Sequence, residues 1–420
     1  MNTTITSQDS VLDVVIKTVA DPAALAVLLA TVFGFILPML WIYPPIAPRP
    51  SDFLNETHTK LGQGWSRIDD ANEAKLKAKA SKAAFAGKAV DDASSESAAS
   101  SPPTPTTPLS TGPPAINSLW IYPIKSCGGI QVQRTRRNDS MGESYVVLRY
   151  PWTEPGWAGR WAWFAAKLAR GWRAVPEVEV VLPLSLPADD KARAAATYGR
   201  VRIWRDTIRA LDLSAELPRS LQLYLGVSNR LGLLRIDPDH LREIYRNAPR
   251  KEEAGYQPVT GFQDAYPVHL LNRSSVRHLE TVTDLDETLP DLDERRFRAN
   301  IIVEGFEEYD EDTWKLVSFK PPPNSRSLLD EAKFYVCART VRCIMPNIHP
   351  DTGKKHKREP DYALRKFRDV DEGCPRWGCL GMQLAPLFEN TDKPELMELT
   401  LEAGMSVTVL QKGAHKYIKI

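Results

Sequence analysis

Residues 337–383 read CARTVRCIMPNIHPDTGKKHKREPDYALRKFRDVDEGCPRWGCLGMQ, and this stretch decides which fold is expected. Apolar and β-branched residues interrupted by basic ones lead up to Cys343, a pattern that predicts a strand. Pro346, Pro350 and the Asp-Thr-Gly triplet at 351–353 then predict a loop with a turn. A thiol therefore stands where a strand gives way to irregular backbone, a place where reactive groups are often presented.

The surroundings of this thiol are positively charged. Arg342 precedes Cys343, and a nearby cation favours the thiolate that binds metal. Between Lys354 and Arg368 there are seven Lys or Arg residues against two acids, a field that suits a phosphate-bearing ligand. Taken singly, a lone cysteine is more often a small buried apolar residue, and a basic run is usually a solvated face.

Together the motifs resemble the MOSC domain, specifically the subgroup like the mitochondrial amidoxime-reducing component. The resemblance is carried by Arg-Cys-Ile at 342–344, His-Pro-Asp-Thr-Gly at 349–353 and Lys-Arg-Glu-Pro at 357–360. In that family the corresponding cysteine is a ligand of a molybdenum cofactor. The resemblance implies that Cys343 is the metal ligand and catalytic residue, with Arg342 beside the cofactor.

Composition narrows the remaining classes of function. The 420 residues are enough for two or three domains with a large core, and a net charge of +1 gives no sign of nucleic-acid binding. Five cysteines are too few and too uneven for a secreted disulfide framework, which favours a reducing compartment.

An apolar segment near the N-terminus predicts a membrane anchor. Residues 23–43 contain no charge, and as a helix they would span about 31 Å, the thickness of a bilayer core. A cleaved signal peptide is the alternative, but the preceding residues hold one basic and three acidic side chains and no clear cleavage site follows. Basic residues downstream predict a soluble part facing the cytosol, in the mitochondrial outer membrane or, alternatively, the endoplasmic reticulum.

The expected organisation is an N-terminal tail (1–22), a transmembrane helix (23–43), a low-complexity tether (44–115) and two soluble domains. The tether combines an Ala- and Lys-rich helix at 71–90 with a Ser/Thr/Pro-rich spacer at 91–114. The resemblance implies an N-terminal β-barrel domain over 116–260 and a mixed α/β MOSC β-barrel domain over 261–412. The fold class is therefore α+β, mostly β.

The first soluble domain opens with LWIYPIKSCGGI at 119–130, a short strand followed by a Lys-Ser turn. Alone it would be an ordinary hairpin, or a turn that binds an anion. It matches the family's Y-P-[IV]-K-S-C signature, which implies that Lys125 and Ser126 lie at the pterin-phosphate part of the cofactor. Where relatives carry an arginine before the next strand, this chain has Ser144.

Later elements of this domain follow from apolar patterns. We expect strands at 145–150, 178–182, 201–204 and 231–236, and a helix at 217–225. A segment with five tryptophans, Trp152 to Trp172, contains a predicted amphipathic helix at 160–170. It is interpreted as core or as a family insertion, with contact to a membrane surface as the alternative.

Two motifs of the second domain carry further predicted contacts. At 261–272 the residues Asp264 and Pro267 match a Y-S-D-x-x-P-like segment, and Gln263 and Ala265 flank the aspartate. The resemblance assigns all three residues from 263 to 265 to the cofactor. A helix is expected near Val276, capped by Ser274 or Ser275.

The sequence FRANI at 297–301 resembles the family's F-R-P-N-I motif, which implies that Arg298 and Asn300 bind the cofactor. An arginine suits phosphate or pterin carbonyl groups because its planar fork donates two parallel hydrogen bonds. A surface salt bridge from Arg298 to Glu294 or Asp293 is the alternative. Further on, residues 377–383 are expected to form a loop that includes Gln383, and 407–410 a closing strand.

The resemblance implies a membrane-bound oxidoreductase that holds molybdopterin with molybdenum and reduces small N-hydroxylated, amidoxime-type substrates. Its electrons would come from a b-type cytochrome and an NADH-dependent reductase. Soft sulfur ligands suit a redox metal, and the cofactor carries the chemistry. Two alternatives stay open: a sulfur carrier with a persulfide on Cys343, and a membrane scaffold without cofactor.

Overall fold

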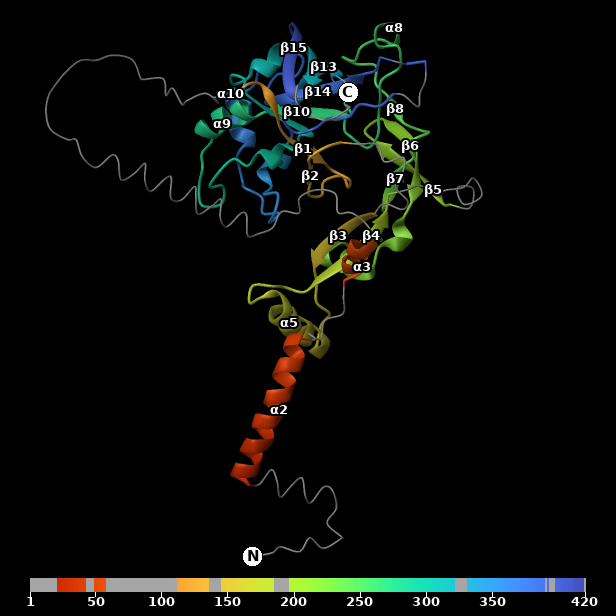
Figure 1. Cartoon of the computed structure of the whole chain (residues 1–420). Helices are drawn as coiled ribbons and strands as arrows, with labels where there is room; N and C mark the ends of the chain where they lie inside the picture. The colour runs from red at the N-terminus through yellow and green to blue at the C-terminus, as the bar shows by residue number, and fades with distance from the viewer. Residues whose placement is uncertain are drawn as a thin grey trace, which may run out of the picture. The chain divides into compact units, whose positions relative to one another are not determined.

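The computed structural model describes residues 21–42, 49–57, 112–135, 145–184, 196–321, 331–389, 391–392 and 397–418 (Figure 1). Tyr43, Ser144 and the predicted helix at 71–90 lie outside these residues, as does nearly all of the predicted spacer. The chain divides into two compact units. We call residues 1–59, 143–195 and 213–233 the sheet unit, and residues 60–142, 196–212 and 234–420 the barrel unit.

Seven strands of the barrel unit form a closed β-barrel. They are β1 (Ala115–Ile121), β10 (Val268–Asn272), β11 (Ile301–Glu304), β12 (Trp314–Lys320), β13 (Ala332–Val341), β14 (Cys379–Leu387) and β15 (Ser406–Lys412). The order around the barrel is β11-β10-β14-β13-β12-β15-β1, and β1 pairs back to β11. Only the β10–β11 pair among these is parallel. The short strand β2 (Ile130–Val132) extends β1 as a hairpin.

Alternation along each strand divides the apolar side chains between two cores. Leu270 of β10 belongs to the barrel interior with Trp314 and Phe319, whereas its neighbour Leu271 faces outward. The outward side is covered by α9 (Arg273–Thr281) and α10 (Asp361–Phe367), which lie beside the barrel in Figure 1. Because large side chains fill the interior, functional groups must lie on the loops and outer edges.

The strand β1 comes from the segment that the sequence assigned to the first domain. It pairs antiparallel with β11, with Leu119 opposite Ile301. The other described strands up to residue 260 form three small sheets: β3 (Tyr145–Pro151) with β4 (Glu177–Pro183); β5 (Tyr198–Ile203), β6 (Asp206–Asp212) and β7 (Leu234–Ile236); and β8 (Arg242–Glu243) with β9 (Val259–Thr260). A mixed α/β fold with a closed barrel is confirmed, and the predicted limits of the domains stay a prediction.

Helices confirm several sequence expectations. The apolar helix α2 (Pro22–Ile42) is long and apolar enough to cross a membrane, judged by length and composition. The predicted helices at 160–170 and 217–225 correspond to α5 (Trp157–Arg170) and α7 (Arg219–Tyr224). Short helices complete the described structure: α8 (Lys251–Ala254), η1 (Ser214–Glu216), η2 (Glu294–Phe297), η3 (Asp310–Thr313) and η4 (Met345–Asn347).

The first part of the predicted tether is structured. Residues 50–57 form α3 (Pro50–Thr57), which packs against β4 in the sheet unit. Arg49 makes a 2.8 Å salt bridge to Glu177, and Ser51 Oγ donates to a Glu179 carboxylate oxygen at 2.9 Å. The description of 44–115 as low-complexity tether is therefore wrong for these residues, because short polar contacts to β4 hold them.

Two local expectations are also wrong. The helix α9 begins at Arg273, and its cap is Asn272, whose side chain accepts from the Ser274 amide at 3.2 Å. The expected loop at 377–383 is mostly strand, because β14 begins at Cys379 and pairs with both β10 and β13. The resemblance to a family loop suggested irregular backbone here, but Gly381 with a φ of 78° is accommodated inside a strand.

A buried carboxyl group links α9 to the loop before β12. Glu311 accepts hydrogen bonds from Ser275 Oγ at 2.7 Å and from Asn272 Nδ2 at 3.0 Å. Burial outweighs these bonds and raises the pKa of Glu311 to about 7. The folded protein therefore holds a proton there that the unfolded chain releases at lower pH.

Glu311 should make stability depend on pH. The ordinary pKa of 4.5 is raised, so its contribution to the free energy of unfolding declines as pH rises from about 4.5 to about 7. Glu311→Gln cannot ionise and should lack this decline. We expect the stability difference between wild type and variant to change by roughly 1–3 kcal/mol between pH 5 and 8. Urea unfolding at each pH measures it, and parallel pH profiles would contradict the assignment.

Candidate functional site

Cys343 lies two residues beyond β13, as the sequence predicted, and its side chain is exposed. The preceding residue is held by a hydrogen bond from the Arg342 amide to the Gly378 carbonyl at 2.9 Å. The following loop is folded back by buried Asn347, which accepts from the Asp361 amide at 3.0 Å. The thiol is therefore exposed to solvent, while hydrogen bonds on both sides of Cys343 hold the backbone in place.

Arg342, beside the thiol, is buried. Its Nη2 donates to the Phe297 carbonyl at 2.9 Å, but its Nε has no hydrogen-bond partner within the part of the chain that the structure describes. Burial lowers the pKa of Arg342, and its interaction with the neighbouring Cys343 opposes this shift. A buried cation with an unsatisfied N–H is costly unless an additional acceptor is supplied.

A second unsatisfied group, His269, lies close to Arg342 and was missed from the sequence. It is on β10, and its buried Nε2 has no partner among the described residues. Burial, with the charge on Arg342, lowers its pKa to about 3, so the ring is neutral near pH 7. A Cβ on Gly381 would lie 2.5 Å from this Nε2, so only glycine fits there. A polar residue within the apolar run VHLLN was the available signal.

Two of the loops predicted to bind the cofactor are joined by an ion pair. Lys125 Nζ lies 2.6 Å from Asp264 Oδ1 and 3.1 Å from the Phe262 carbonyl oxygen, to which it donates. Ser126 occupies a left-handed turn position with a φ of 65°. Both charged side chains are at least half exposed, so the pair can exchange partners at little cost.

The loop around Asp264 is shaped by its neighbours. The side-chain oxygen of Gln263 accepts a hydrogen bond from the Gly261 amide at 2.8 Å. The backbone carbonyl of Gln263 accepts one from the Arg242 guanidinium. Ala265 is half-buried and packs against a small core cluster of the barrel unit. In this arrangement Gln263 and Ala265 shape the loop, while Asp264 is directed to Lys125.

Arg298 also joins loops that are distant in sequence. It has a left-handed φ of 54°, donates to the Cys127 carbonyl and lies 4.3 Å above the Tyr122 ring. Burial raises the pKa of Tyr122 to about 12, so its hydroxyl stays protonated. The alternative of a surface salt bridge is wrong, because Glu294 pairs with Arg273 at 2.7 Å and Asp293 with Arg295.

Asn300 is engaged by the barrel itself. Its Oδ1 accepts from the His269 amide at 3.0 Å, and its Nδ2 donates to the Trp120 carbonyl at 3.2 Å. One side chain thereby bridges β1 and β10. The predicted role of Asn300 as a cofactor contact stays a prediction, and the structure gives it a framework role.

The basic run at 354–368 is partly neutralised. Arg358 lies 3.5 Å from Asp284, Arg365 lies 2.9 Å from Asp361, and buried Arg368 pairs with Asp312. These contacts disperse the positive field that the sequence suggested. The cations predicted to bind the cofactor lie instead in three separate segments of the chain: Lys125, Arg298 and Arg342.

These residues favour a cofactor that brings its own metal ligands. Among the described residues no cluster of three or more His, Cys, Asp or Glu side chains could hold a metal ion. Cys343 can supply a single thiolate, and the neighbouring Arg342, whose Nε has no partner among the described residues, suits an anionic organic group. The residues present therefore fit a metal that is ligated mainly by an organic cofactor.

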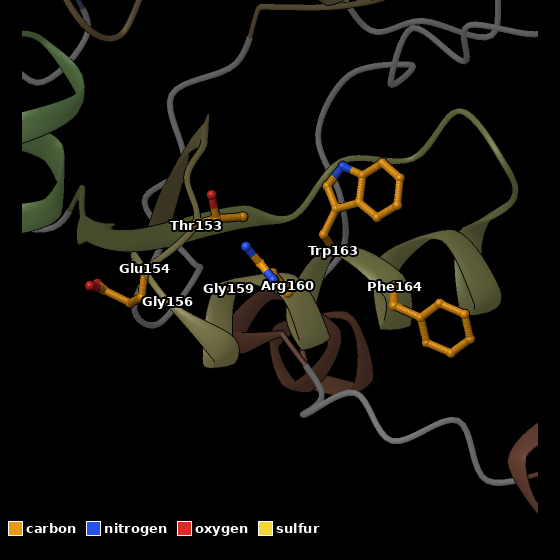
Figure 2. A pocket seen from close by; sticks show the side chains of 7 residues that line it. All are labelled: Thr153, Glu154, Gly156, Gly159, Arg160, Trp163 and Phe164. Carbon is orange, nitrogen blue, oxygen red and sulfur yellow. The ribbon is translucent and has the colours of Figure 1, made fainter.

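A hollow among the described residues lies elsewhere. It has a volume of about 580 Å³, belongs to the sheet unit and is lined by Thr153, Glu154, Gly156, Gly159, Arg160, Trp163 and Phe164 (Figure 2). It contains no thiol and none of the residues around Cys343.

Comparison with known proteins agrees with the sequence motifs. Residues 257–399 match the family model of the MOSC domain. The chain is 24% identical to mitochondrial amidoxime reducing component 2 of Rattus norvegicus over 268 residues, covering 61% of this chain and 73% of that protein. It is 25% identical to mitochondrial amidoxime-reducing component 1 of Xenopus laevis over 269 residues, covering 61% and 72%.

The framework role of Asn300 can be separated from ligand binding. Asn300→Ala leaves the His269 amide and the Trp120 carbonyl without their partner and should lower the free energy of unfolding by about 1–3 kcal/mol. Lys125→Ala removes only an exposed ion pair and should lower it by less than about 1 kcal/mol. Urea unfolding of protein purified without cofactor measures both. Equal losses would show that Asn300 is not part of the barrel framework.

Proposed function

Because the chain contains a MOSC domain, we propose that it is a molybdenum-cofactor oxidoreductase that reduces N-hydroxylated compounds of the amidoxime type. The observation that carries this proposal is the exposed Cys343 thiol beside the buried and incompletely hydrogen-bonded Arg342. The similarity to proteins named amidoxime-reducing components supports the choice of reaction.

Specific residues would hold the cofactor. Cys343 supplies a soft thiolate ligand, which suits molybdenum. Lys125, Arg298 and Arg342 provide cationic donors for phosphate and pterin oxygens. The remaining predicted contacts are Ser126, Gln263, Asp264, Ala265 and Asn300. When bound, the molybdenum centre supplies two-electron chemistry that removes an oxygen atom from nitrogen.

The neighbouring residues set the charge of the site. Arg342, the residue before Cys343, places a positive charge where an anionic cofactor would bind. His269 stays neutral because its pKa is lowered to about 3, so it adds no second charge beside Arg342. The ammonium group of Lys125 can leave Asp264 for a phosphate, because the pair is largely exposed to water.

Membrane attachment and electron supply complete the proposal. The apolar helix α2 would anchor the chain in the mitochondrial outer membrane, with the barrel unit facing the cytosol. A b-type cytochrome and its NADH-dependent reductase would deliver electrons. Two observations support this arrangement. The relatives are named as mitochondrial proteins, and basic residues follow α2 in the sequence.

The assignment of Cys343 predicts a selective loss of activity. Cys343→Ser replaces a thiolate with a hydroxyl of far higher pKa, so we expect nearly complete loss of amidoxime reduction and of bound molybdenum. Wild type should contain about one molybdenum per chain. Cys379→Ser is the matched control, because burial raises the pKa of that thiol to about 12 and keeps it a neutral core residue. The control should keep molybdenum and activity.

The measurements are elemental analysis and turnover with a chemical electron donor. Wild-type turnover in Cys343→Ser, or loss only in Cys379→Ser, would refute the ligand assignment. Absence of molybdenum from wild-type protein made in a cofactor-producing host would favour the scaffold. A persulfide on Cys343 detected by mass spectrometry in such protein would favour the sulfur carrier.

The cation assignment predicts which substitutions release the pterin. Lys125→Ala and Arg298→Ala each remove a charge-assisted donor, so cofactor affinity should fall by about 1.5–3 kcal/mol, or roughly 10- to 150-fold. Lys355→Ala removes an exposed charge of the basic run and should leave affinity unchanged. Fluorescence of the released, oxidised pterin measures occupancy. The same loss in all three variants would show that diffuse charge, and not these contacts, retains the ligand.

A further inference from the structure

The helix α5 of the sheet unit presents an apolar ridge to solvent. Trp157, Trp161, Phe164 and Leu168 follow one another at spacings of four, three and four residues, so they lie along one side of the helix. Their exposed fractions are 83%, 55%, 51% and 46%. The rings of Trp161 and Phe164 are 5.9 Å apart, so the ridge is continuous.

The orientation of α5 is set by small residues on other sides of the helix. Gly159, Ala165 and Ala166 are buried. A Cβ on Gly159 would lie 1.9 Å from the Glu154 carbonyl oxygen, so the backbone is packed too closely for any side chain. The helix therefore buries its small residues and exposes its large aromatic ones, the reverse of an ordinary surface helix. Such an exposed patch is typical of a contact surface.

Positive charge accompanies this ridge. The helix contains Arg160, Lys167 and Arg170 but no acidic residue. Arg160 lies 5.2 Å from the Trp157 ring and Lys167 lies 4.3 Å from the Trp163 ring. Tryptophan combined with Lys and Arg is the composition of segments that lie in the headgroup region of a bilayer.

The hollow beside this helix contributes to the same surface. Figure 2 shows Arg160 near Glu154 and Gly156, while Trp163 and Phe164 extend from the following turns. Glu154 accepts a hydrogen bond from the Trp152 indole at 3.1 Å. The hollow of about 580 Å³ thus places a guanidinium next to exposed aromatic rings, a combination that suits a phosphate with attached apolar chains.

The chain itself keeps this surface close to α2. Six residues, 43–48, separate the end of α2 from Arg49. Arg49 is fixed to Glu177 of β4 by the 2.8 Å salt bridge, and Ser51 is fixed to Glu179. Even a fully extended connection of this length spans only about 25 Å. The sheet that follows α5 is therefore held within about that distance of the apolar helix.

We propose that α5 lies in the headgroup region of the bilayer that α2 spans, with its apolar ridge inserted and its cations on anionic phospholipids. This inference rests on the membrane anchor of the proposed function, but it concerns a separate surface. The ridge and the anchor together form two contacts with one membrane, so binding of the ridge is favoured by its high local concentration. The occupant of the ridge is an anionic lipid surface.

The test uses the full chain reconstituted in vesicles of phosphatidylcholine and phosphatidylglycerol at a molar ratio of about 7:3, a composition that supplies the anionic surface. The vesicles contain a phospholipid with a diazirine near its headgroup, and mass spectrometry locates the adducts after illumination. We expect adducts in α2 and in residues 157–172. In the double variant Trp161→Glu and Phe164→Glu, the amount of lipid adduct in residues 157–172 should fall at least about fivefold, because charge opposes insertion. Trp204→Glu is the matched control, an exposed tryptophan in the barrel unit, and should change nothing.

Charge is tested with a second variant. Arg160→Gln with Lys167→Gln should lower labelling of 157–172 in the mixed vesicles and have little effect in pure phosphatidylcholine. Thermal unfolding checks that each variant keeps its fold. If α2 were labelled but residues 157–172 carried no more lipid adducts than the barrel unit, this inference alone would be overturned. If α2 itself were unlabelled, the membrane anchor would be refuted. If residues 157–172 gave cross-links to protein in place of lipid adducts, both in detergent and in vesicles, the ridge would be a protein contact. That result would also overturn the inference.

Discussion

The pairing of β1 with β11 is the constraint on which the barrel and its site depend. It closes the sheet on itself, and it brings a strand from near residue 120 against one from near residue 301. The loop after β1 carries Lys125, and the loop before β11 carries Arg298. The loop before β11 also contacts the segment after β13, because Arg342 Nη2 donates to the Phe297 carbonyl and Arg296 Nη1 donates to the Pro346 carbonyl. Without closure, Lys125, Arg298 and Arg342 would belong to unrelated parts of the chain.

Polar groups reinforce this closure where the strands themselves cannot. The side chain of Asn300 bridges β1 and β10, and Arg298 holds the turn after β1 through the Cys127 carbonyl. Beside them, Arg342 and His269 are buried, and each has a nitrogen atom without a hydrogen-bond partner among the residues that the structure describes. The polar groups of the barrel framework thus have hydrogen-bond partners, whereas those near the exposed thiol lack some of theirs in the described part of the chain. Such an arrangement is pre-formed for a ligand. Arg298 and Asn300 therefore combine a role in the barrel framework with their proposed contacts to the cofactor.

Features set by local sequence could be predicted. The strand leading to Cys343, the apolar helix α2 and the helix at 157–170 follow from short-range patterns, and the short motifs identified the family. Features set by distant contacts could not. The strand β14 contains glycine, and its conformation depends on pairing with β10 and β13, which lie far away in sequence. His269 appeared to be one polar residue in an apolar run until the fold placed Arg342 beside it.

The strand β11, which pairs with β1, is synthesised long after β1, and this order affects the nascent chain. About 180 residues separate the end of β1 from the start of β11. At roughly 5–20 residues per second, a ribosome needs on the order of 10–40 s to produce the missing strand. During that time an apolar strand of the nascent chain has unpaired backbone groups on one edge and is open to association with other chains. The edge of the segment around Leu119 and Trp120 therefore stays uncovered until β11 has been synthesised.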